Sequence, residues 1–595
     1  MQQETKQCQN CKQDFIIESD DFAFYERMKV PSPTFCPDCR TQRRLSFRNE
    51  RTLYKRPCGL CGKEVVSLYH KDNKQTVFCQ QCWWSDEWNT LDYGKEYNFS
   101  RPFFEQFEEL MYKVPVPALT TFYTTLLNSD YNNQVSNLKN CYLLFNSDYN
   151  ENAGYGTEIE HSKDSFDNLM IDECSIAYSN INCQKCYEIF YSIDCENSHN
   201  IWFSKNLVGC SNCFGCVNLR NAQYHIWNEK YTKEEYEKKL KNFGLDAWGN
   251  IKEYKIQFKE FLKKFPYKYI HGRLNSNVTG DYVSHSKDVK NSFIVTEAQN
   301  CKYCWWMLVK PVKDCFDYME FGDNAQNIYE AMNAGDGVND IKFGLFCFTN
   351  VSRAQYATRC FTSHDIFGCV SLRNKSFCIL NKQYSEDEYN QLLPKIIEHM
   401  NEMPYTDKKG NIYKYGEFFP SEISQFAYNE TSALEYFPLS NEEAVAKGFA
   451  WKDTEERGYQ IDIKPRDLPQ SINSVEDDIL KKVIGCEHEG KCSDNCTTAF
   501  KLIPQELQFL KRAGIPLPRL CPNCRHAERM KDRNPLKLWH RKCQCKGVSS
   551  ENEVYQNTGK HFHGDSHCQN EFETSYDPDG SEIVYCEQCY QQEVS

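Results

Sequence analysis

The feature that most limits the fold is a set of regularly spaced cysteine pairs. Cys-x-x-Cys occurs four times near the N-terminus, at Cys8/Cys11, Cys36/Cys39, Cys58/Cys61 and Cys79/Cys82. Each pair places two thiolates on one tight turn, and two such turns complete the tetrahedral ligand set that Zn²⁺ prefers. The apolar residues between the pairs are too few to build a core without metal. The spacing therefore predicts structural zinc sites in preference to redox dithiols.

Length and composition set the broad class. The chain has 595 residues and 33 cysteines, enough for several domains. No apolar run approaches the roughly 20 residues needed to cross a bilayer, which argues against a membrane protein. The N-terminal segment is polar and already contains a cysteine pair, unlike a signal peptide. We therefore expect a cytoplasmic protein whose cysteines are metal ligands or buried thiols rather than disulfides.

The C-terminal segment repeats the N-terminal design at an offset of 485 residues. This offset places Cys36/Cys39 on Cys521/Cys524, which indicates an internal duplication. The first turn of the third site is ambiguous, because Cys492 and Cys496 are spaced Cys-x-x-x-Cys and Cys486 competes with them. In the fourth site three cysteines compete for two places, with His563 and His567 nearby.

The predicted ligands would hold about four Zn²⁺ ions. Sites formed in chain order and interleaved sites with exchanged partners both remain open. The candidate ligands are Cys8, Cys11, Cys36, Cys39, Cys58, Cys61, Cys79, Cys82, Cys492, Cys496, Cys521, Cys524, Cys543, Cys545, Cys568, Cys586 and Cys589.

The stretches Pro31–Arg40 and Pro516–Arg525 both follow the pattern Pro-x-Pro-x-x-Cys-Pro-x-Cys-Arg. With the preceding cysteines and aromatic-rich turn, this pattern resembles the family called the probable zinc-ribbon domain. The resemblance covers Cys8–Arg44 and Cys492–Met530. The whole chain is also similar to uncharacterised cysteine-rich proteins of small-genome bacteria, which carry such ribbons around an Asn- and Cys-rich middle. The resemblance implies bound zinc and no established activity.

Between the modules the sequence indicates two β-solenoid lobes. Short segments rich in Asn, Ser, Cys and aromatic residues begin at Lys139, Lys163 and Gln184, with spacings of 24 and 21 residues. Such a period matches one coil of a parallel β-helix, in which like residues stack inward and Asn fills corners with unusual backbone angles. The run FGCVNLRN at Phe214 recurs as FGCVSLRN at Phe367, so a second lobe repeats the first at an offset near 152.

A helix-like segment follows each lobe, with Thr232 and Ser385 as predicted N-caps. These helices are expected to cover the open solenoid ends. The predicted fold is mainly β: two parallel β-helix (solenoid) lobes with helical caps, flanked by N- and C-terminal zinc-ribbon modules. The expected order is a double zinc-ribbon module (1–95), a helical linker (96–127), lobe 1 (128–228), a cap and connector (229–281), lobe 2 (282–383), a cap and Pro-interrupted connector (384–475) and a second double zinc-ribbon module (476–595).

Fifteen cysteines lie in the central lobes. An iron–sulfur interpretation of the Cys-x-x-Cys-x-x-Cys run at Cys210 lacks a fourth thiolate, because Arg220 stands in its place. Lobe 2 has Ser292 where lobe 1 has Cys141, an exchange typical of small buried residues rather than of metal ligands. We therefore predict stacked buried thiols, with a further metal site or redox chemistry as alternatives.

The sequence offers little sign of catalysis. Nucleotide-binding loops, zinc-protease motifs and serine-hydrolase elbows do not occur in it. The best local constellation is His561, His563 and His567, which we interpret as a loop near the fourth zinc that supplies at most one ligand. The sequence favours a non-enzymatic scaffold that engages a macromolecule. An enzyme with its active site in a solenoid groove and a protein-only scaffold are the alternatives.

Two basic segments stand out in a chain of net charge -13. Their arginines follow three- and four-residue steps, so on a helix they would form one stripe suited to phosphates. RNA or single-stranded nucleic acid is the predicted partner, although arginines beside a four-thiolate zinc also compensate its negative charge. The candidates are Arg40, Arg44, Arg48, Arg51, Arg525, Arg529 and Arg533.

Overall fold

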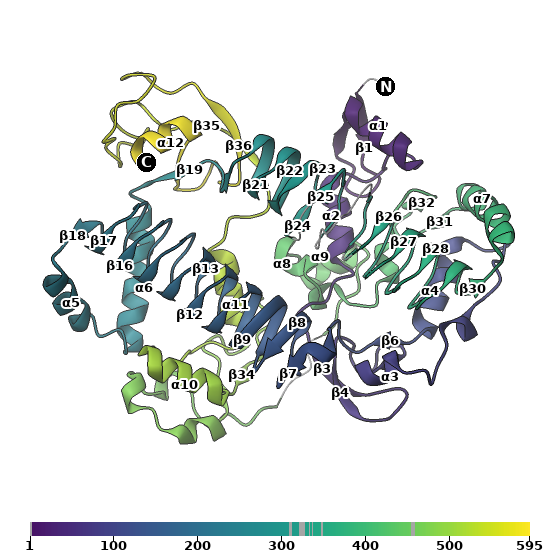
Figure 1. Ribbon diagram of the computed structural model, residues 1–595, viewed down its shortest axis with the longest axis horizontal. Helices are drawn as coiled ribbons and strands as arrows, with labels where there is room; N and C mark the ends of the chain where they lie inside the picture. Colours follow the sequence, from purple (N-terminus) through teal and green to yellow (C-terminus); the bar gives the residue numbers. More distant parts are fainter. Residues whose placement is uncertain are drawn as a thin grey trace.

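The computed structural model describes residues 3–308, 312–319, 328–332, 334–335, 337–346, 349–453 and 458–594. The chain is mainly β, with solenoid lobes, a few helices and cysteine-rich clusters near both ends, so the predicted fold class is confirmed (Figure 1). In the figure the two lobes run away from the middle of the molecule in opposite directions. Within the described ranges, we find no helix with the length and apolar character that a membrane span requires.

Each lobe is a stack of short parallel strands. Lobe 1 contains β7 (Leu126–Leu127), β8 (Asn133–Lys139), β9 (Tyr142–Glu160), β10 (Lys163–Phe166), β11 (Leu169–Asp172), β12 (Ser175–Tyr178), β13 (Ile181–Gln184), β14 (Tyr187–Phe190), β15 (His199–Trp202), β16 (Ser211–Phe214) and β17 (Gln223–Ile226). Lobe 2 contains β20 (Gly272–Arg273), β21 (Ser276–Ser284), β22 (Lys287–Thr296), β23 (Ala298–Lys302), β24 (Trp305–Met307), β25 (Val312–Lys313), β26 (Asn339–Lys342), β27 (Ser352–Gln355), β28 (His364–Phe367) and β29 (Ser376–Ile379).

The coil of lobe 1 is shorter than the sequence period suggested. Lys163 pairs with Ser175, and Ser175 pairs with Tyr187, so one coil takes 12 residues. Along this lobe a left-handed residue recurs at nearly every third position, as at Asp164 and Asp167, and turns the chain at four corners per coil. Asn residues fill many of these corners, as predicted. The interpretation of 24 and 21 residues as one coil was wrong. One coil has four sides of three residues, whereas these spacings cover eight and seven such sides.

Every third residue points into the coil, where little space remains. Ser165, Asn168, Ile171 and Cys174 are such a set, and all four are buried. The Cys174 thiol donates to the carbonyls of Asp172 and Cys183, each at 3.4 Å. The described central cysteines are free and buried, as the thiol-stack interpretation predicted, and Cys347 lies outside the described residues.

Burial favours the protonated form of two of these central thiols. It raises the pKa of Cys141 and of Cys378 to about 11. A thiol that stays protonated is a poor nucleophile and a poor metal ligand. These two cysteines therefore act as small core residues.

Helices follow the far end of each lobe. Helix α5 (Lys233–Asn242) comes after lobe 1 and α7 (Glu386–Glu402) after lobe 2. The predicted N-caps are confirmed: Thr232 and Ser385 each accept a hydrogen bond from the backbone of a glutamate three residues on, which completes a capping box. Antiparallel strands β18 (Glu229–Lys230) and β30 (Lys382–Gln383) close the last coils.

The end modules carry most of the other regular elements. The N-terminal module contains β1 (Glu4–Gln7), β2 (Asp14–Ile17), α1 (Ser19–Met28), α2 (Pro37–Leu45), β3 (Tyr54–Pro57), β4 (Glu64–Ser67), β5 (Val77–Phe78) and α3 (Gln80–Trp84). The C-terminal module contains β33 (Ile484–Gly485), β34 (Ala499–Phe500), α10 (Pro504–Ala513), α11 (Pro522–Lys531), β35 (Trp539–Lys542), β36 (Glu571–Thr574), β37 (Ile583–Tyr585) and α12 (Glu587–Val594). Linking segments contain α4 (Phe103–Lys113), β6 (Val116–Pro117), α6 (Trp248–Leu262), β19 (Pro266–Lys268), β31 (Tyr405–Thr406), β32 (Ile412–Tyr413), α8 (Ala433–Tyr436) and α9 (Asn441–Ala446).

The modules dock crosswise on the lobes. Figure 1 shows α1 and α2 beside lobe 2, and α10 and α11 beside lobe 1. Each module also pairs with a strand just before the other lobe: β5 lies parallel to β6, and β37 lies parallel to β19. Each module therefore contacts both halves of the central region.

Candidate metal centres and the arginine helices

Each end module assembles two groups of four cysteines whose sulfur atoms lie within 4.8 Å of one another. Each group joins turns that are neighbours in the chain, which is the chain-order arrangement and not the interleaved one. Site 1 is Cys8, Cys11, Cys36 and Cys39; site 2 is Cys58, Cys61, Cys79 and Cys82; site 3 is Cys486, Cys496, Cys521 and Cys524; site 4 is Cys543, Cys568, Cys586 and Cys589.

One backbone hydrogen bond repeats in all four sites. The N–H of Cys36, Cys79, Cys521 or Cys586 donates to the sulfur of the first cysteine in its site, at 3.2–3.3 Å. In site 3 that first cysteine is Cys486, which sequence reasoning had kept only as a competitor.

Cys492, the ligand chosen from the sequence for site 3, also lies at this centre. Its Sγ is 3.7 Å from Sγ of Cys524. Site 3 therefore has five sulfurs close to one position, with Cys486 in the place that Cys8 takes in site 1.

The sulfur spacing fits a tetrahedral zinc ion. Four sulfurs at about 2.3 Å from Zn²⁺ lie about 3.8 Å from one another. The measured Sγ–Sγ distances are 3.7 Å for Cys11–Cys36, 4.0 Å for Cys61–Cys79, 3.8 Å for Cys486–Cys524 and 3.9 Å for Cys568–Cys586.

The thiols in these sites also favour ionisation of one member. Hydrogen bonds from neighbouring thiols hold the pKa of Cys8, Cys521 and Cys586 well below the ordinary value. The same hydrogen bonds raise the pKa of Cys36, Cys524 and Cys589, so without a cation one thiolate in each of these sites is favoured.

In sites 1 and 3 the second turn starts a helix. Cys36 is the N-cap of α2 and Cys521 the N-cap of α11, each followed by a proline at the first helical position. Proline suits that position because its missing N–H would have no partner there. The cysteine turn thus fixes both the start and the direction of a helix that carries arginines.

The arginines of α2 point into lobe 2. Arg40 donates through Nε to Asp317, and Arg43 donates to Glu330 at 2.8 and 3.0 Å. Arg43 also reaches Glu417 at 3.2 Å. Burial disfavours the charge, yet the carboxylate of Asp317 raises the pKa of Arg40 well above its ordinary value.

The arginines of α11 make the equivalent contacts with lobe 1. Arg525 donates to Asp167 and, at 2.9 Å, to Glu506. Arg529 donates to the second oxygen of Asp167 at 3.1 Å and to the carbonyl of Tyr155 at 2.9 Å. Burial lowers the pKa of Arg529 to about 10.

The remaining predicted arginines also contact protein groups. Arg48 donates to Gln134 at 2.8 Å, and Arg51 donates to Thr157 at 2.6 Å. The guanidinium of Arg533 lies 5.2 Å from the centre of the Tyr436 ring. Six of the seven predicted arginines are buried, and Arg51 is half-buried.

The expectation that this arginine stripe faces solvent, where it could bind phosphates, is therefore wrong. The stripe forms, but it faces the solenoids, because buried carboxylates on the lobes satisfy it. Sequence reasoning missed these carboxylates. A signal was present: Asp167 and Asp317 each follow a phenylalanine at matching places in the duplicated lobes.

Cys545 belongs to a different group from the one expected. Site 4 is complete with Cys543 and Cys568, whereas Cys545 lies with His561, His563 and Cys589 in a second group of candidate ligands. His567 instead approaches the carbonyl of Cys568, with Nδ1 at 2.8 Å.

No protein-family model fits the chain, and no curated protein is significantly similar to it.

Proposed function

We propose that this protein is a non-enzymatic, zinc-binding scaffold. The observation that carries the proposal is that each end module contains two closed sets of four cysteines, spaced as zinc ligands would be. Four protein ligands leave no coordination position for a substrate or an activated water, so such sites are structural. The described cysteines are free, which suits a reducing compartment such as the cytoplasm.

The role of zinc in this scaffold is to hold the two modules on the lobes. In sites 1 and 3 a metal ion would fix the turn from which an arginine helix enters a lobe. Arg40 and Arg525 then meet Asp317 and Asp167 inside the protein. Binding free energy at the metal would thus stabilise the contact between each module and a lobe that is more than two hundred residues away in the chain.

The test is the metal content of the reduced full-length protein, measured by elemental analysis. Zinc should be bound, and Cys11→Ser, Cys61→Ser, Cys568→Ser and the double variant Cys492→Ser/Cys496→Ser should each remove one ion from their own site. Iron in place of zinc, or metal content that is unchanged in these variants, would contradict the proposal.

A second candidate is the binding of single-stranded nucleic acid in a basic cleft. A cavity of about 830 Å³ lies between lobe 1, α6 and the C-terminal module. Its lining includes Lys252, Lys255, Lys259 and Lys263 of α6, together with Arg519 and Lys531. Lys259 contacts Asp532 at 2.7 Å, so part of this charge is already compensated. A basic groove that follows a phosphate backbone is the usual basis of such binding.

The cleft is tested with a labelled single-stranded RNA over a series of salt concentrations. Charge reversal at Lys252, Lys259 and Lys263 should weaken binding and flatten the log–log salt dependence by about 0.7 for each lost phosphate contact. The matched control reverses Lys233, Lys238 and Lys241, which are exposed on α5. Equal effects of the two triple variants would remove this candidate.

A further inference from the structure

The C-terminal module contains an insertion that the N-terminal module lacks. In site 2 the first turn is Cys58-x-x-Cys61, whereas in site 4 the first two ligands, Cys543 and Cys568, are 25 positions apart. The residues between them include only isolated bridges, Cys545 with Ser550 and Ser549 with Gln556. In Figure 1 this segment is part of the yellow loop beside α12. A loop of this length without regular structure, which adds only Cys545 and Tyr555 to the apolar cluster of the module, needs another source of order.

The insertion nevertheless contains buried polar side chains that converge on one point. Cys545 and His561 are buried, and the ligand atoms of Cys545, His561, His563 and Cys589 lie within 4.8 Å of one another. Nδ1 of His561 is 3.4 Å from Sγ of Cys545, and Nε2 of His563 is 3.2 Å from Sγ of Cys589. In a tetrahedral zinc site, nitrogen and sulfur ligands lie about 3.5 Å apart.

Each histidine has its other ring nitrogen fixed by an acceptor. Nε2 of His561 lies 2.8 Å from a carboxylate oxygen of Glu593, and Nδ1 of His563 lies 2.7 Å from the carbonyl of Ser566. These acceptors select the tautomer that turns a lone pair toward the cysteines. This is the arrangement usual for metal-bound histidines.

Glu593 is itself held in place as an acceptor. It receives hydrogen bonds from the N–H groups of Thr558 at 2.8 Å and Gly559 at 3.0 Å, and from the hydroxyl of Tyr555 at 2.9 Å. Burial works against its charge, but the backbone donors keep the pKa of Glu593 below its ordinary value. A fixed carboxylate behind a ligating histidine is a common outer partner in zinc sites.

Hydrogen-bond donors around the sulfur of Cys545 would stabilise a negative charge on it. It accepts hydrogen bonds from the side-chain amide of Asn557 at 3.2 Å and from the N–H of Gly547 at 3.4 Å. Both donors come from the insertion. The loop therefore folds around this sulfur, and a metal ion at the centre would account for a buried cysteine and two histidines in a loop that adds little else than Tyr555 to the apolar cluster of the module.

From this geometry we infer that the C-terminal module holds a further divalent metal ion, bound by Cys545, His561, His563 and Cys589. Cys589 belongs to site 4 as well, so its thiolate bridges the two ions in a binuclear zinc centre. The chain would then bind one ion beyond those of the four-cysteine sites. The added ion orders the insertion, and its four protein ligands make the site structural rather than catalytic.

The experiment uses the full-length protein loaded with Zn²⁺ or with ¹¹³Cd²⁺. Wild type should contain five ions, one for each of sites 1 to 4 and one for the added site. The double variant His561→Ala/His563→Ala should contain four, and Cys589→Ser should contain three because both ions lose a ligand. Cadmium NMR should show one resonance typical of two sulfur and two nitrogen ligands, absent from the double variant. His567→Ala is the matched control and should keep five ions.

Either of two results with wild type and the double variant would overturn the inference. One is a wild-type cadmium spectrum with four-sulfur resonances alone; the other is metal content that the double variant leaves unchanged.

Failure of the double variant to fold is covered by Glu593→Gln, which keeps all four ligands. That variant should weaken retention of one ion against a chelator by about 10- to 100-fold and leave the other ions as in wild type. If Glu593→Gln releases every ion at the wild-type rate, the inference is also wrong. Loss of zinc from sites 1 to 4 alone would test the proposed function instead, because the mixed-ligand resonance reports only on the added site.

Discussion

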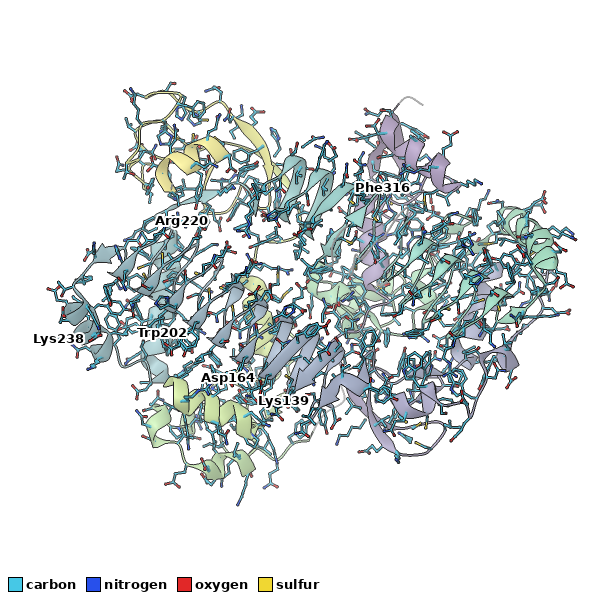
Figure 2. All side chains as sticks on the ribbon, viewed as in Figure 1. Lys139, Asp164, Trp202, Arg220, Lys238 and Phe316 are labelled. Atoms are coloured by element: carbon cyan, nitrogen blue, oxygen red, sulfur yellow. The ribbon has the colours of Figure 1, made fainter. Side chains whose placement is uncertain are left out.

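The two docking interfaces between modules and lobes match almost contact for contact. Figure 2 labels Phe316, beside the N-terminal module, and Asp164, on the side of lobe 1 near α10. These residues belong to three pairs of equivalent contacts, related by offsets of 485 and 150 residues. The pairs are Phe24–Phe316 with Phe509–Phe166, Arg27–Asp314 with Arg512–Asp164, and Arg40–Asp317 with Arg525–Asp167. The repeating unit is therefore a module together with the lobe on which it docks.

The interfaces differ at several positions of the arginine helix, and at one of these the sign of the charge is reversed. Arg43 on α2 is buried between Glu330 and Glu417, whereas its equivalent on α11 is Glu528, which is exposed and lines the basic cleft. The shared contacts are those needed to hold a module on a lobe. The N-terminal interface adds buried ion pairs between Arg43 and the carboxylates of Glu330 and Glu417, whereas at Glu528 the described part of the C-terminal interface has no buried ion pair.

The largest expected effect is loss of metal from either interface. Cys36→Ser and Cys521→Ser should each release the arginine helix of their own module, since zinc supplies on the order of 10 kcal/mol to small metal-dependent units. Limited proteolysis with mass spectrometry should show cleavage in the affected module and an intact solenoid. Cys174→Ser, the same change at an inward lobe position, is the control and should leave the protease pattern unchanged. Protection of both modules after loss of their ions would show that the lobes alone hold them.

A smaller effect is expected from the buried arginines. Arg40→Ala and Arg525→Ala each leave a buried aspartate without its main partner, which costs about 3–5 kcal/mol. Hydrogen exchange of α2 and α11 should report that loss as a lower free energy of local opening. The position with reversed charge sharpens the comparison: Arg43→Ala should destabilise α2, whereas Glu528→Ala should change α11 by less than about 0.5 kcal/mol. Equal effects of these two variants would mean that the buried charges around Arg43 add no stability.

The fold could be predicted from the sequence because the geometry of a solenoid restricts which residue types occur at its corners and in its interior. Asn at corners and small residues inside follow directly from left-handed turns and a narrow coil, and both are visible without a structure. The coil length was missed for the same reason. A unit of three residues generates apparent periods at many multiples of three. The most similar segments, such as those at Lys139 and Lys163, are several units apart, so their spacing exceeds one coil.

The metal sites and the arginines show where sequence reasoning stops. The spacing of the cysteines identifies the turns, but it does not show whether Cys486 or Cys492 is the first ligand of site 3. In the structure the backbone N–H of Cys521 donates to the sulfur of Cys486, as the equivalent N–H does in the other sites. The periodicity of the arginines correctly places them on one stripe of a helix. Whether that stripe meets solvent or a carboxylate depends on Asp167 and Asp317, which lie more than a hundred residues away from the helices they contact.

The smallest expected effect comes from a contact that only one half of the molecule has. Asp281 at the start of lobe 2 is buried against His271 at 3.0 Å, whereas Asp130, its equivalent in lobe 1, is exposed. Burial works against a charged His271 ring, but Asp281 and Asp194 hold the pKa of His271 above its ordinary value. The other groups that face the ring are Lys205, Tyr282 and Tyr576.

This asymmetry gives a pH dependence with a definite sign. A histidine whose folded pKa is raised contributes its full stability below the unfolded pKa of about 6.5, and that stability is lost as pH rises through the folded value. Because Ser575 of the C-terminal module also bonds Asp281, the module should open more readily at its contact with lobe 2 as pH rises above about 6.5. Hydrogen exchange of β36, corrected for the intrinsic exchange rate at each pH, measures this opening, and β5 in the N-terminal module is the internal control. His271→Gln keeps a neutral polar side chain and should remove the pH dependence of β36. If β36 and β5 respond to pH alike, His271 does not control this interface.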